Sequence, residues 1–335
     1  MVNYYPVSVV ISVYRGLMYV ERSINSLINQ SFQSFEFVLI DDCGGDGAFE
    51  KAKSLTDNSL LAERSQYIVH ERNMGIAASR NTGLAAAIGE YIIYLDSDDF
   101  FEPNLLEELY NVALKNNADL VISDFTREMP NGISIYAKDT FCKDVITEIT
   151  DKERYIKEML ISVKGCSLWN KLIKRDLFLS NHVSFHDNMR DDLSVSPILV
   201  YLARRIAFVH KALTHYSVQY NTGSETFSFN HLPFVGNALI HLESFFMGRG
   251  MDYSNIFLRY KANTKRKMLL HPKPEMKPDD ILRLFPEVDS ALKKGVRLEP
   301  KIHYQILLLL AIRRNKTAFK IYRWVLLKLL KAAPL

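Results

Sequence analysis

The sequence is poor in several features that would place it in a special class of protein. Its 335 residues include only three cysteines, Cys43, Cys142 and Cys166, which lie far apart without metal-ligand or C-x-x-C spacing. We therefore expect no disulfide framework. The nine histidines are scattered in the same way, so a zinc site is not expected either.

Long apolar runs are absent as well. No stretch approaches the roughly 20 apolar residues that a helix needs to span a bilayer. Residues 1–6 lack the basic segment of a secretory signal, and the apolar run over residues 7–13 is short and rich in β-branched side chains. We interpret that run as a strand and expect a cytoplasmic protein. The composition, 48% hydrophobic and 24% charged, is that of an ordinary globular protein with one large domain or two smaller ones.

The last part of the chain has no acidic residue. From Lys301 to the end there are eight lysines and arginines and no Asp or Glu, whereas residues 1–300 carry 34 basic and 38 acidic side chains. The basic charge is therefore local, and it gives no reason to expect a nucleic-acid partner.

From residue 313 onward the pattern predicts an amphipathic helix. At 100° per residue, the basic face holds Arg313, Lys316, Lys320, Arg323, Lys328 and Lys331. The opposite face holds Phe319, Tyr322, Val325, Leu326, Leu329 and Leu330, with Trp324 and Leu327 at the boundary. A basic amphipathic helix over 313–331 suits peripheral contact with the inner face of an anionic membrane. A terminal helix that packs on the rest of the protein with its basic face in water is the alternative.

Strand and helix signals alternate in the first 125 residues. The apolar runs lie at 7–13, 35–40, 67–69, 91–95 and 120–122, and helical patterns lie near 17–30, 46–57, 75–88 and 103–117. This alternation predicts an α/β fold with a mainly parallel sheet and helices on both faces. Beyond it we expect a hairpin at Asn131-Gly132, a strand or two near 206–218, a linker around Pro272–Pro278, and helices elsewhere.

The most informative segment is Tyr91–Asp99, where an apolar strand stops at three carboxylates, Asp96, Asp98 and Asp99. Several anions at the end of a buried strand are electrostatically costly unless a cation or a hydroxyl-bearing ligand binds there. A D-x-D pattern suits Mg²⁺ or Mn²⁺, whose other ligands are phosphate oxygens. An acidic turn that caps the next helix is the structural alternative.

Other strands of the predicted sheet end in polar residues too, which places Ser12-Val13-Tyr14, Asp41-Asp42 and residues 70–73 at the same edge. Ligands bind at this edge of open α/β sheets. The dinucleotide fingerprint G-x-G-x-x-G and the Walker motif are both missing. A phosphohydrolase with Asp96 as its nucleophile stays possible, although its motif normally follows the first strand of the core.

Several motifs in order then resemble glycosyltransferase family 2. They are Val7-Ser-Val-Val-Ile-Ser-Val-Tyr14, Ser26-Leu-Ile-Asn-Gln-Ser-Phe32, Phe37-Val-Leu-Ile-Asp-Asp42, Asn73-Met-Gly-Ile-Ala-Ala-Ser-Arg-Asn-Thr-Gly83, Gly89-Glu-Tyr-Ile-Ile-Tyr-Leu-Asp-Ser-Asp-Asp99, Ser167-Leu-Trp-Asn-Lys-Leu172 and Arg190-Asp-Asp-Leu193. The resemblance covers roughly residues 5–225. It implies a GT-A fold, a nucleotide-sugar donor such as a UDP-sugar, and transfer with inversion to a hydroxyl of a glycan or lipid-linked acceptor in surface polysaccharide or glycolipid synthesis.

The resemblance also implies roles for single residues. The donor would contact Ser12, Tyr14, Asp42, Arg80, Asp96 and Ser97, and Asp98 would bind Mn²⁺ or Mg²⁺. Asp192 would be the general base, with Asp191 beside it, held by Arg190 or orienting. Trp169 and Lys171 would lie on the acceptor side, and His215 with 221–224 would form a loop over the donor phosphates.

The chain departs from the family pattern in two places. Ser12 and Arg15 replace a common Pro and Asn, which puts the nucleotide preference in question, whereas Asp191 in place of Glu is a mild change. We expect a GT-A domain over 1–225, with a nucleotide-sugar half at 1–125 and an acceptor half at 126–225, followed by a helical region at 226–335. A non-catalytic, membrane-associated nucleotide-binding protein is a further alternative.

Overall fold

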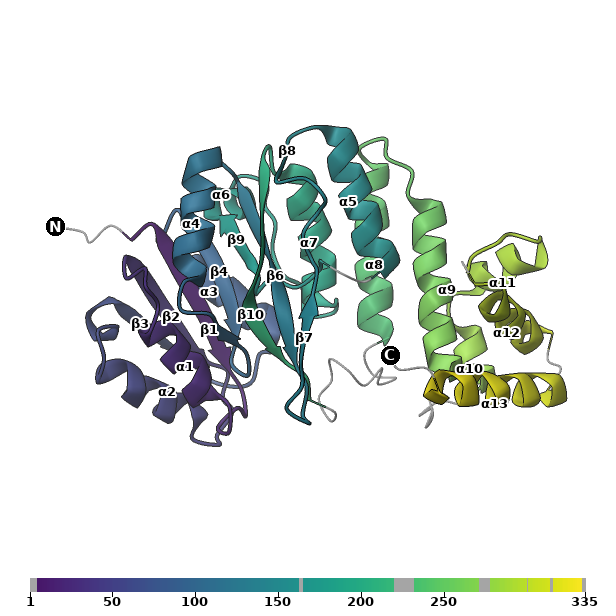
Figure 1. The fold of residues 1–335 in the computed structure, drawn as a ribbon, viewed down its shortest axis with the longest axis horizontal. Coiled ribbons are helices and arrows are strands. Elements are labelled where there is room, and N and C mark those ends of the chain that lie inside the picture. The colour runs from purple at the N-terminus through teal and green to yellow at the C-terminus, as the bar shows by residue number, and fades with distance from the viewer. Residues whose placement is uncertain are drawn as a thin grey trace. The chain divides into compact units, whose positions relative to one another are not determined.

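The chain folds into two compact units. The computed structural model describes residues 5–162, 165–219, 232–270, 278–299, 301–313 and 316–332. One unit comprises Met1–Glu225 with Pro233–Leu242, and the other comprises Thr226–Leu232 with Glu243–Leu335. The first unit is built on one sheet and the second, in its described residues, is helical (Figure 1). The α/β fold expected from the alternating pattern is thus confirmed.

The sheet of the first unit has ten strands. They are β1 (Val7–Val13), β2 (Phe35–Asp41), β3 (Ser65–Val69), β4 (Tyr91–Asp96), β5 (Phe100–Phe101), β6 (Leu120–Glu128), β7 (Ser134–Ala137), β8 (Val145–Ile146), β9 (Lys171–Lys174) and β10 (Ile206–Ser217). Their order is β3-β2-β1-β4-β9-β6-β10-β5, with β7 on β6 and β8 on β10. The expected hairpin and the expected strand near 206–218 are both present, as β6–β7 and β10.

The four longest ladders in this sheet are parallel, whereas its five shorter pairings, two of which involve β9, are antiparallel. β1 pairs in parallel with β2 and β4, β2 with β3, and β6 with β10. β9 lies antiparallel between β4 and β6 and so joins the two halves of the unit into one sheet. The sequence analysis did not predict β9 or the two-residue strand β5.

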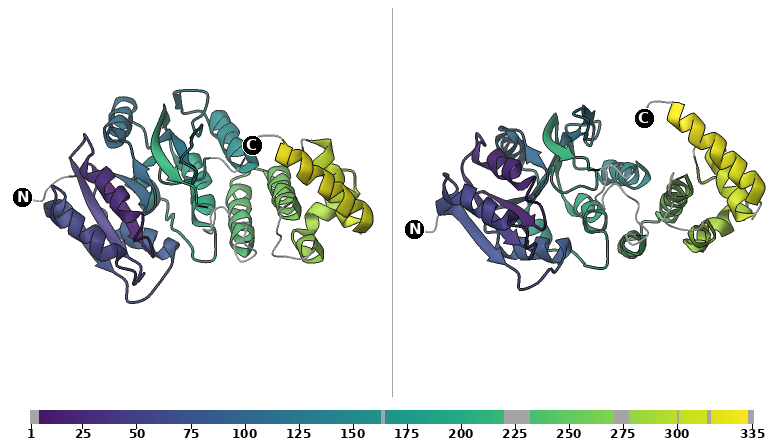
Figure 2. Two further views of the ribbon diagram at one scale, coloured as in Figure 1. Left: turned by 60° about the horizontal axis from the view of Figure 1, so that its bottom comes forward. Right: turned by 90° about the horizontal axis from the view of Figure 1, so that it is seen from below.

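Helices cover both faces of this sheet, as the two views of Figure 2 show. The core under α1 (Val20–Ile28), α2 (Ala48–Asp57) and α4 (Leu105–Asn116) takes the odd-numbered residues of β1 and β2. α3 (Ile76–Ala86) packs on the other face, where a Cβ on Gly83 would lie 2.3 Å from Cγ1 of Val10. Continuous apolar strands bury side chains on both faces, which explains why these runs do not alternate.

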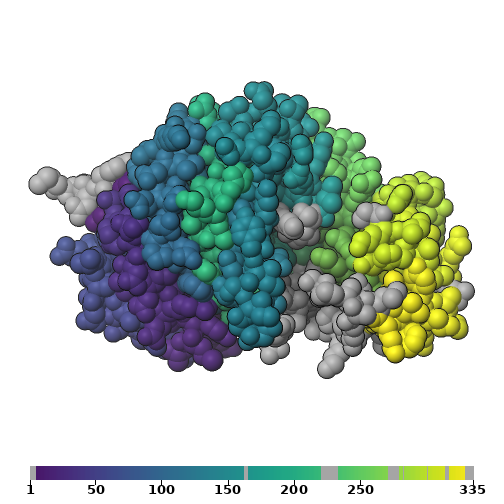
Figure 3. Space-filling model, viewed as in Figure 1, coloured from purple at the N-terminus to yellow at the C-terminus, as the bar shows by residue number. Residues whose placement is uncertain are grey.

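Four further helices complete the first unit. They are α5 (Ile149–Ser162), α6 (Arg175–Leu179), α7 (Asp191–Leu202) and the beginning of α8 (Leu232–Met247). In Figure 3 the green residues of β10 reach the surface between the blue residues of α4 and the teal residues of β6 and β7. This is the region in which β10 approaches the short strand β5.

The second unit has its own apolar core. Its helices are the end of α8, α9 (Ser254–Leu270), α10 (Pro278–Arg283), α11 (Pro286–Lys293), α12 (Ile302–Ile312) and α13 (Lys316–Ala332). Side chains of α9, α11, α12 and α13 are buried together. No helix in the described part of the chain is both long and apolar enough to cross a membrane. Most of the expected proline-containing linker, 271–277, lies outside the described residues.

Candidate functional site

The carboxyl ends of β2, β1 and β4 meet at one edge of the sheet. Asp41 is paired with Val13, and Ser12 is paired with Asp96. The loops that follow pack closely, since a Cβ on Gly44 would lie 2.6 Å from the backbone nitrogen of Arg15. The register therefore brings the strand ends that the sequence singled out into one site.

The acidic loop 96–99 is held from two sides. From α1, the Arg22 guanidinium donates to the Asp98 carbonyl (3.1 Å), and the Ser23 hydroxyl donates to the Ser97 carbonyl (2.8 Å). From β10, the Ser217 amide donates to Oδ1 of Asp99 (2.8 Å), and its hydroxyl donates to the Asp98 carbonyl (2.6 Å). The loop conformation is thus fixed by backbone and side-chain hydrogen bonds before any ligand is bound.

Two carboxyl groups of this loop have raised pKa values, because their surroundings disfavour the ionised form. Burial, together with the charge of Asp96, raises the pKa of Asp98 to about 6. Burial also raises the pKa of Asp99 well above its usual value, and its Oδ2 is buried without a hydrogen-bond partner. A bound cation would relieve both effects. Oδ2 of Asp98 accepts a hydrogen bond from the Gln219 amide (3.0 Å).

These residues fit a cation that is held by few protein ligands. No group of three or more His, Cys, Asp or Glu side chains that could hold a metal occurs among the described residues. Mg²⁺ commonly takes one or two carboxylates and completes its shell with water and phosphate oxygens. Asp98 suits that mode of binding, whereas a closed, all-protein metal site does not fit the structure.

Ser12 lies near the carboxyl end of β1 and Tyr14 directly follows that strand, and their contact with a donor stays a prediction. The Tyr14 side chain is 43% exposed, and the Arg15 guanidinium lies 5.1 Å from the centre of its ring. Arg15 has a positive φ of 52°, which turns the chain sharply after β1. An exposed aromatic ring at a strand end offers a surface for a base or a ribose.

Asp42 is engaged in organising the neighbouring loop. Its carboxylate lies 2.8 Å from Nδ1 of His70 and accepts hydrogen bonds from the amides of Met74 (2.8 Å) and Gly75 (2.9 Å). The residue is only 3% exposed. Contact between Asp42 and a base thus stays a prediction, and in this structure its oxygens connect β2 to the start of α3.

Arg80 links the end of β4 to the start of α7. Its guanidinium, 7% exposed, donates to Oδ1 of Asp96 (3.0 Å) and pairs with the Asp191 carboxylate. Although burial opposes it, the charges of Asp191 and Asp96 raise the pKa of Arg80. The expectation that Arg80 faces the diphosphate is not tested, but the structure places it between two carboxylates that are 95 residues apart in the sequence.

Asp191 and Asp192 begin α7 and have different arginine partners. Arg190 makes a two-pronged contact with Asp192, at 2.9 and 3.3 Å, which corrects the expectation that it holds Asp191. Burial raises the pKa of Asp191 despite the nearby Arg80. Burial opposes ionisation of Asp192 too, but Arg190 lowers its pKa below the usual value. Of the pair, Asp192 therefore has the lower pKa.

The two residues expected on the acceptor side are both buried. Lys171 is fully buried between Asn170 (2.9 Å) and Asp139 (3.4 Å), and burial lowers its pKa. The structure thus corrects the prediction for Lys171, because a buried ammonium cannot touch an acceptor. Trp169 is 7% exposed, and its ring stacks on that of Tyr216 with the ring centres 5.6 Å apart.

His215 is also held away from the expected phosphate loop. Its ring nitrogens lie 2.6 Å from a Glu128 oxygen and 2.7 Å from a Glu102 oxygen, and its ring stacks on Phe100. Its predicted role over the donor phosphates is therefore corrected. The other part of that prediction, 221–224, lies outside the described residues.

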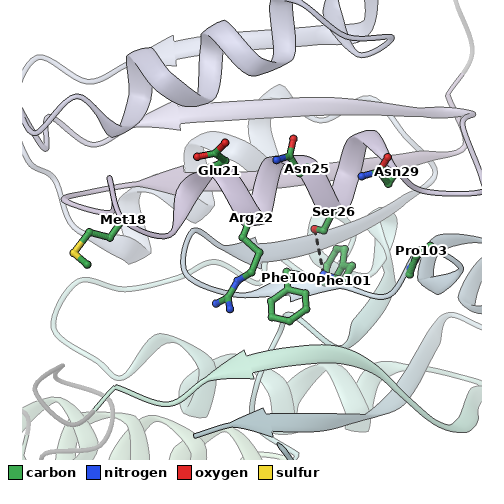
Figure 4. Close-up of a pocket in the computed structure, with 9 residues that line it drawn as sticks. All are labelled: Met18, Glu21, Arg22, Asn25, Ser26, Asn29, Phe100, Phe101 and Pro103. Atoms are coloured by element: carbon green, nitrogen blue, oxygen red, sulfur yellow. Dashed lines mark hydrogen bonds between the residues drawn. The ribbon is translucent and has the colours of Figure 1, made fainter. Parts of the chain in front are cut away.

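A groove of about 530 Å³ runs along α1 behind the acidic loop. In Figure 4, Arg22 extends from α1 toward Phe100, whose ring centre lies 4.3 Å from its guanidinium. The amide of Phe101 donates to the Ser26 hydroxyl (3.2 Å). The residues that line the groove are Met18, Glu21, Arg22, Asn25, Ser26, Asn29, Phe100, Phe101 and Pro103, and the carboxylates of the acidic loop are not among them.

Several residues that shape the site escaped the sequence analysis. Arg22, Ser23, Ser217 and Gln219 all bind the acidic loop, yet none stands in a motif that names this role. Ser217 and Gln219 lie about 120 residues from the loop in sequence. Only the pairing of β10 with β5 brings them there, and no local pattern signals that pairing.

Comparisons with known proteins agree with this architecture. The family model described as "Glycosyl transferase family 2" matches residues 8–180. A cholesterol galactosyltransferase of Borreliella burgdorferi is 31% identical over 222 residues, 62% of this chain and 59% of that protein. Glycosyltransferase GlyG of Streptococcus pneumoniae is 29% identical over 224 residues, 63% of this chain and 70% of that protein. The chain thus matches about three fifths of the first relative's length.

Among solved structures, S. aureus TarS 1-349 in complex with UDP-GlcNAc is similar with a TM-score of 0.67. The match covers 95% of this chain and 91% of that one at 20% identity. At 20% identity this similarity shows a shared fold alone.

Proposed function

Because this chain belongs to glycosyltransferase family 2, we propose that it transfers a sugar from a nucleotide-diphosphate donor to an acceptor hydroxyl with inversion. The observation that carries the proposal is the convergence of two acidic groups on one buried arginine. Arg80 connects Asp96, at the end of β4, with Asp191, at the start of α7. The end of β4, where we place the donor, and the carboxylates of Asp191 and Asp192 are thus linked through one arginine. A displacement with a general base requires a donor and a carboxylate that lie close together.

For the donor, we propose a UDP-sugar bound across the ends of β1, β2 and β4. The exposed ring of Tyr14 would lie against the nucleoside. The Asp96 carboxylate would accept a hydrogen bond from a hydroxyl of the nucleoside, and the Ser97 hydroxyl would donate or accept one. TarS, which shares this fold, was crystallised with UDP-GlcNAc, and this makes UDP-sugars the first donors to test.

For the metal, we propose Mn²⁺ or Mg²⁺ held by Asp98. Such an ion, when bound, neutralises charge that develops on the departing diphosphate. The contribution of the chain is to keep Asp98 fixed through Gln219 and Ser217, and to leave Asp99 buried behind it. The raised pKa of Asp98 supports a cation partner for this carboxylate.

For the general base, we propose Asp192. It is ionised at neutral pH because Arg190 lowers its pKa, and its side chain is 21% exposed, so an acceptor hydroxyl can approach it. Asp191 would keep the start of α7 in place through Arg80. The proton removed from the acceptor hydroxyl would pass to the Asp192 carboxylate as the hydroxyl oxygen attacks the sugar.

For the acceptor, we propose a glycan or a lipid-linked hydroxyl in surface polysaccharide or glycolipid synthesis. The Borreliella relative is a cholesterol galactosyltransferase, which gives a lipid acceptor a precedent among the similar proteins. Peripheral contact with a membrane through 313–331 is part of this proposal.

The test is a thermal-shift screen of UDP-, GDP- and dTDP-sugars with and without Mn²⁺, followed by a transfer assay with the donor that binds. A ligand at 100 times its Kd stabilises the folded state by about 2.7 kcal/mol. We expect one nucleotide class to raise the melting temperature, and only when the metal is present. Stabilisation by none of these donors would count against the proposal. A phosphorylated Asp96, trapped after reaction with a phosphate ester, would favour a phosphohydrolase instead.

A further inference from the structure

The buried side of α13 is the side that the sequence pattern assigned to a membrane. Phe319 and Leu326 are 7% and 6% exposed and belong to the apolar core of the second unit, with Leu269 of α9 and Leu308 of α12. Nε of Arg323 donates to the Leu269 carbonyl at 2.7 Å. Part of the apolar stripe and one of the basic residues are therefore used inside the unit.

A different face of α13 points outward. Ile321 is 60% exposed, Trp324 is 59% exposed and Val325 is 38% exposed. Lys320 and Lys328 are exposed as well, and Nζ of Lys328 lies 4.6 Å from the Trp324 ring centre. Spacings of three and four residues put these side chains on one face of the helix. We call this set, 320, 321, 324, 325 and 328, the outer face.

The chemistry of the outer face favours an anionic lipid surface. Tryptophan places an apolar ring and a polar N–H at a membrane interface, and lysines extend their charge toward the headgroups. The sequence from Lys301 onward has eight basic residues and no acidic one. A second copy of this chain would bring these lysines together, which is electrostatically unfavourable.

We propose that the outer face of α13 binds the headgroup region of an anionic membrane, with Trp324 and Ile321 inserted and Lys320 and Lys328 beside the lipid phosphates. The contact deepens the proposed function, because it would bring the enzyme to lipid-linked acceptors. Vesicle binding needs neither donor nor transfer, however, so the membrane contact can fail while the transfer activity stands, and the transfer activity can fail while the membrane contact stands.

The first experiment is co-sedimentation of the full chain with phosphatidylcholine vesicles that contain or lack 30% phosphatidylglycerol. We expect binding only to the anionic vesicles, and loss of that binding at high salt. Each juxtamembrane lysine contributes about a fivefold factor in affinity. Replacing Lys320 and Lys328 with Glu should thus weaken binding about 25-fold or more, whereas Lys115→Glu on α4, exposed in the first unit, should have little effect.

The second experiment uses the tryptophans as probes. The chain has two, Trp169 at 7% and Trp324 at 59% exposure, so the emission that responds to aqueous quenchers comes from Trp324. We expect anionic vesicles to shift that emission to the blue and to protect it from iodide. The shift should disappear in Trp324→Phe.

The variant Ile321→Ser/Trp324→Ala should abolish vesicle binding with an unchanged melting temperature, because both side chains are exposed. Leu60→Ser, at a position that is 78% exposed in the first unit, is the matched control and should bind like the parent. The proposal is overturned if the double variant binds as well as the parent, or if the parent binds no anionic vesicle. A dimer in light scattering that the double variant dissociates would overturn it as well and would assign the outer face to a second copy.

Discussion

Two acidic clusters of the first unit differ in how their charges are compensated. In the loop 96–99, Asp96 pairs with Arg80, but Asp98 and Asp99 have raised pKa values, and Arg22 donates to the backbone carbonyl of Asp98. At the start of α7, Asp191 and Asp192 are each paired with an arginine side chain, and the pKa of Asp192 is lowered. At Asp98 and Asp99 the protein leaves negative charge for a ligand to neutralise, whereas the charge of Asp192 is compensated by Arg190. This difference suits a cation site at Asp98 and an ionised base at Asp192.

Removing the central carboxylate of the first cluster should have the largest effect. We expect Asp98→Ala to abolish metal-dependent donor binding, because no group of three or more metal-binding side chains in the described residues can replace it. Isothermal titration with Mn²⁺ and the donor measures this loss. Asp144→Asn, at a carboxylate that is 90% exposed, is the control. Unchanged affinity in Asp98→Ala would mean that the two clusters do not differ in the way described.

Removing the charge of Asp192 in the second cluster should slow sugar transfer and leave donor binding unchanged. We expect Asp192→Asn to lower kcat by about 10²–10⁴-fold with donor affinity within about twofold of the parent, because a general base contributes to the reaction step alone. Asp191→Asn should cost less in kcat, since Asp191 only supports α7 through Arg80. Near-normal transfer by Asp192→Asn would move the base assignment elsewhere.

Breaking the link between the clusters should lower transfer by about 10²-fold, the effect of a misplacement of about 1 Å. The change is Arg80→Met, which leaves Asp96 and Asp191 without their shared counter-charge. The loss of stability is expected to lie below the about 3–5 kcal/mol of a fully buried pair, because Asp96 is 33% exposed.

Two further variants test whether the link acts through charge. Arg80→Lys keeps the positive charge but loses the planar guanidinium that donates to two carboxylates. Relative to Arg80→Met, it should therefore recover more of the stability than of the transfer activity. Adding Asp191→Asn to Arg80→Met should recover part of the melting temperature. If the double variant were no more stable than Arg80→Met, the contact with Asp191 would not matter energetically.

As the pH falls, Asp98 of the first cluster should be protonated before Asp192 of the second. The pKa of Asp98 is raised to about 6, so lowering the pH from 7 to 5 should reduce metal-dependent donor binding by about tenfold. Asp192, whose pKa is lowered, should stay ionised over that range. A donor affinity independent of pH between 5 and 7 would contradict the assignment.

Without metal, ionisation of Asp98 lowers the free energy of unfolding. A carboxyl group with a raised pKa in the folded state holds its proton more tightly there than in the unfolded chain. Its contribution to the free energy of unfolding is thus present at low pH and is lost as the pH rises from about 4 to about 6. Chemical denaturation over this range in the parent and in Asp98→Asn should reveal a decline of about 2–3 kcal/mol that the variant lacks.

The sequence predicted the parts of the fold that depend on local patterns. The continuous apolar runs before Tyr14, Asp42 and Asp96 identified three strands and the edge of the sheet where they end. The motif around Gln30 was recognised as well, although its function in this structure is to connect α1 to the start of α4 through hydrogen bonds to Glu102 and Leu106. The local D-x-D pattern also indicated Asp98, whereas the resemblance to the family indicated Asp192.

The rest depends on contacts between distant segments. Lys171 stands in a recognisable motif, but only the antiparallel insertion of β9 shows that its side chain is buried beside Asp139. The division of arginines between Asp191 and Asp192 depends on the approach of α3 to α7, which no local pattern reveals. Which side of α13 is buried in the second unit could not be predicted, because helical projection separates apolar from charged residues but does not say which side has a partner.

The position of β9 also limits how the first unit can move. Tyr91 and Ile92 of β4 pair with Lys174 and Ile173, and Ile173, Leu172 and Lys171 pair with Leu120–Ile122 of β6. Separating β4 from β6 would break backbone hydrogen bonds on both edges of this strand. We therefore expect the amides of β9 to exchange with deuterium only on global unfolding. Adjustments during turnover are then expected in the loops at the sheet edge and not in an opening of the sheet.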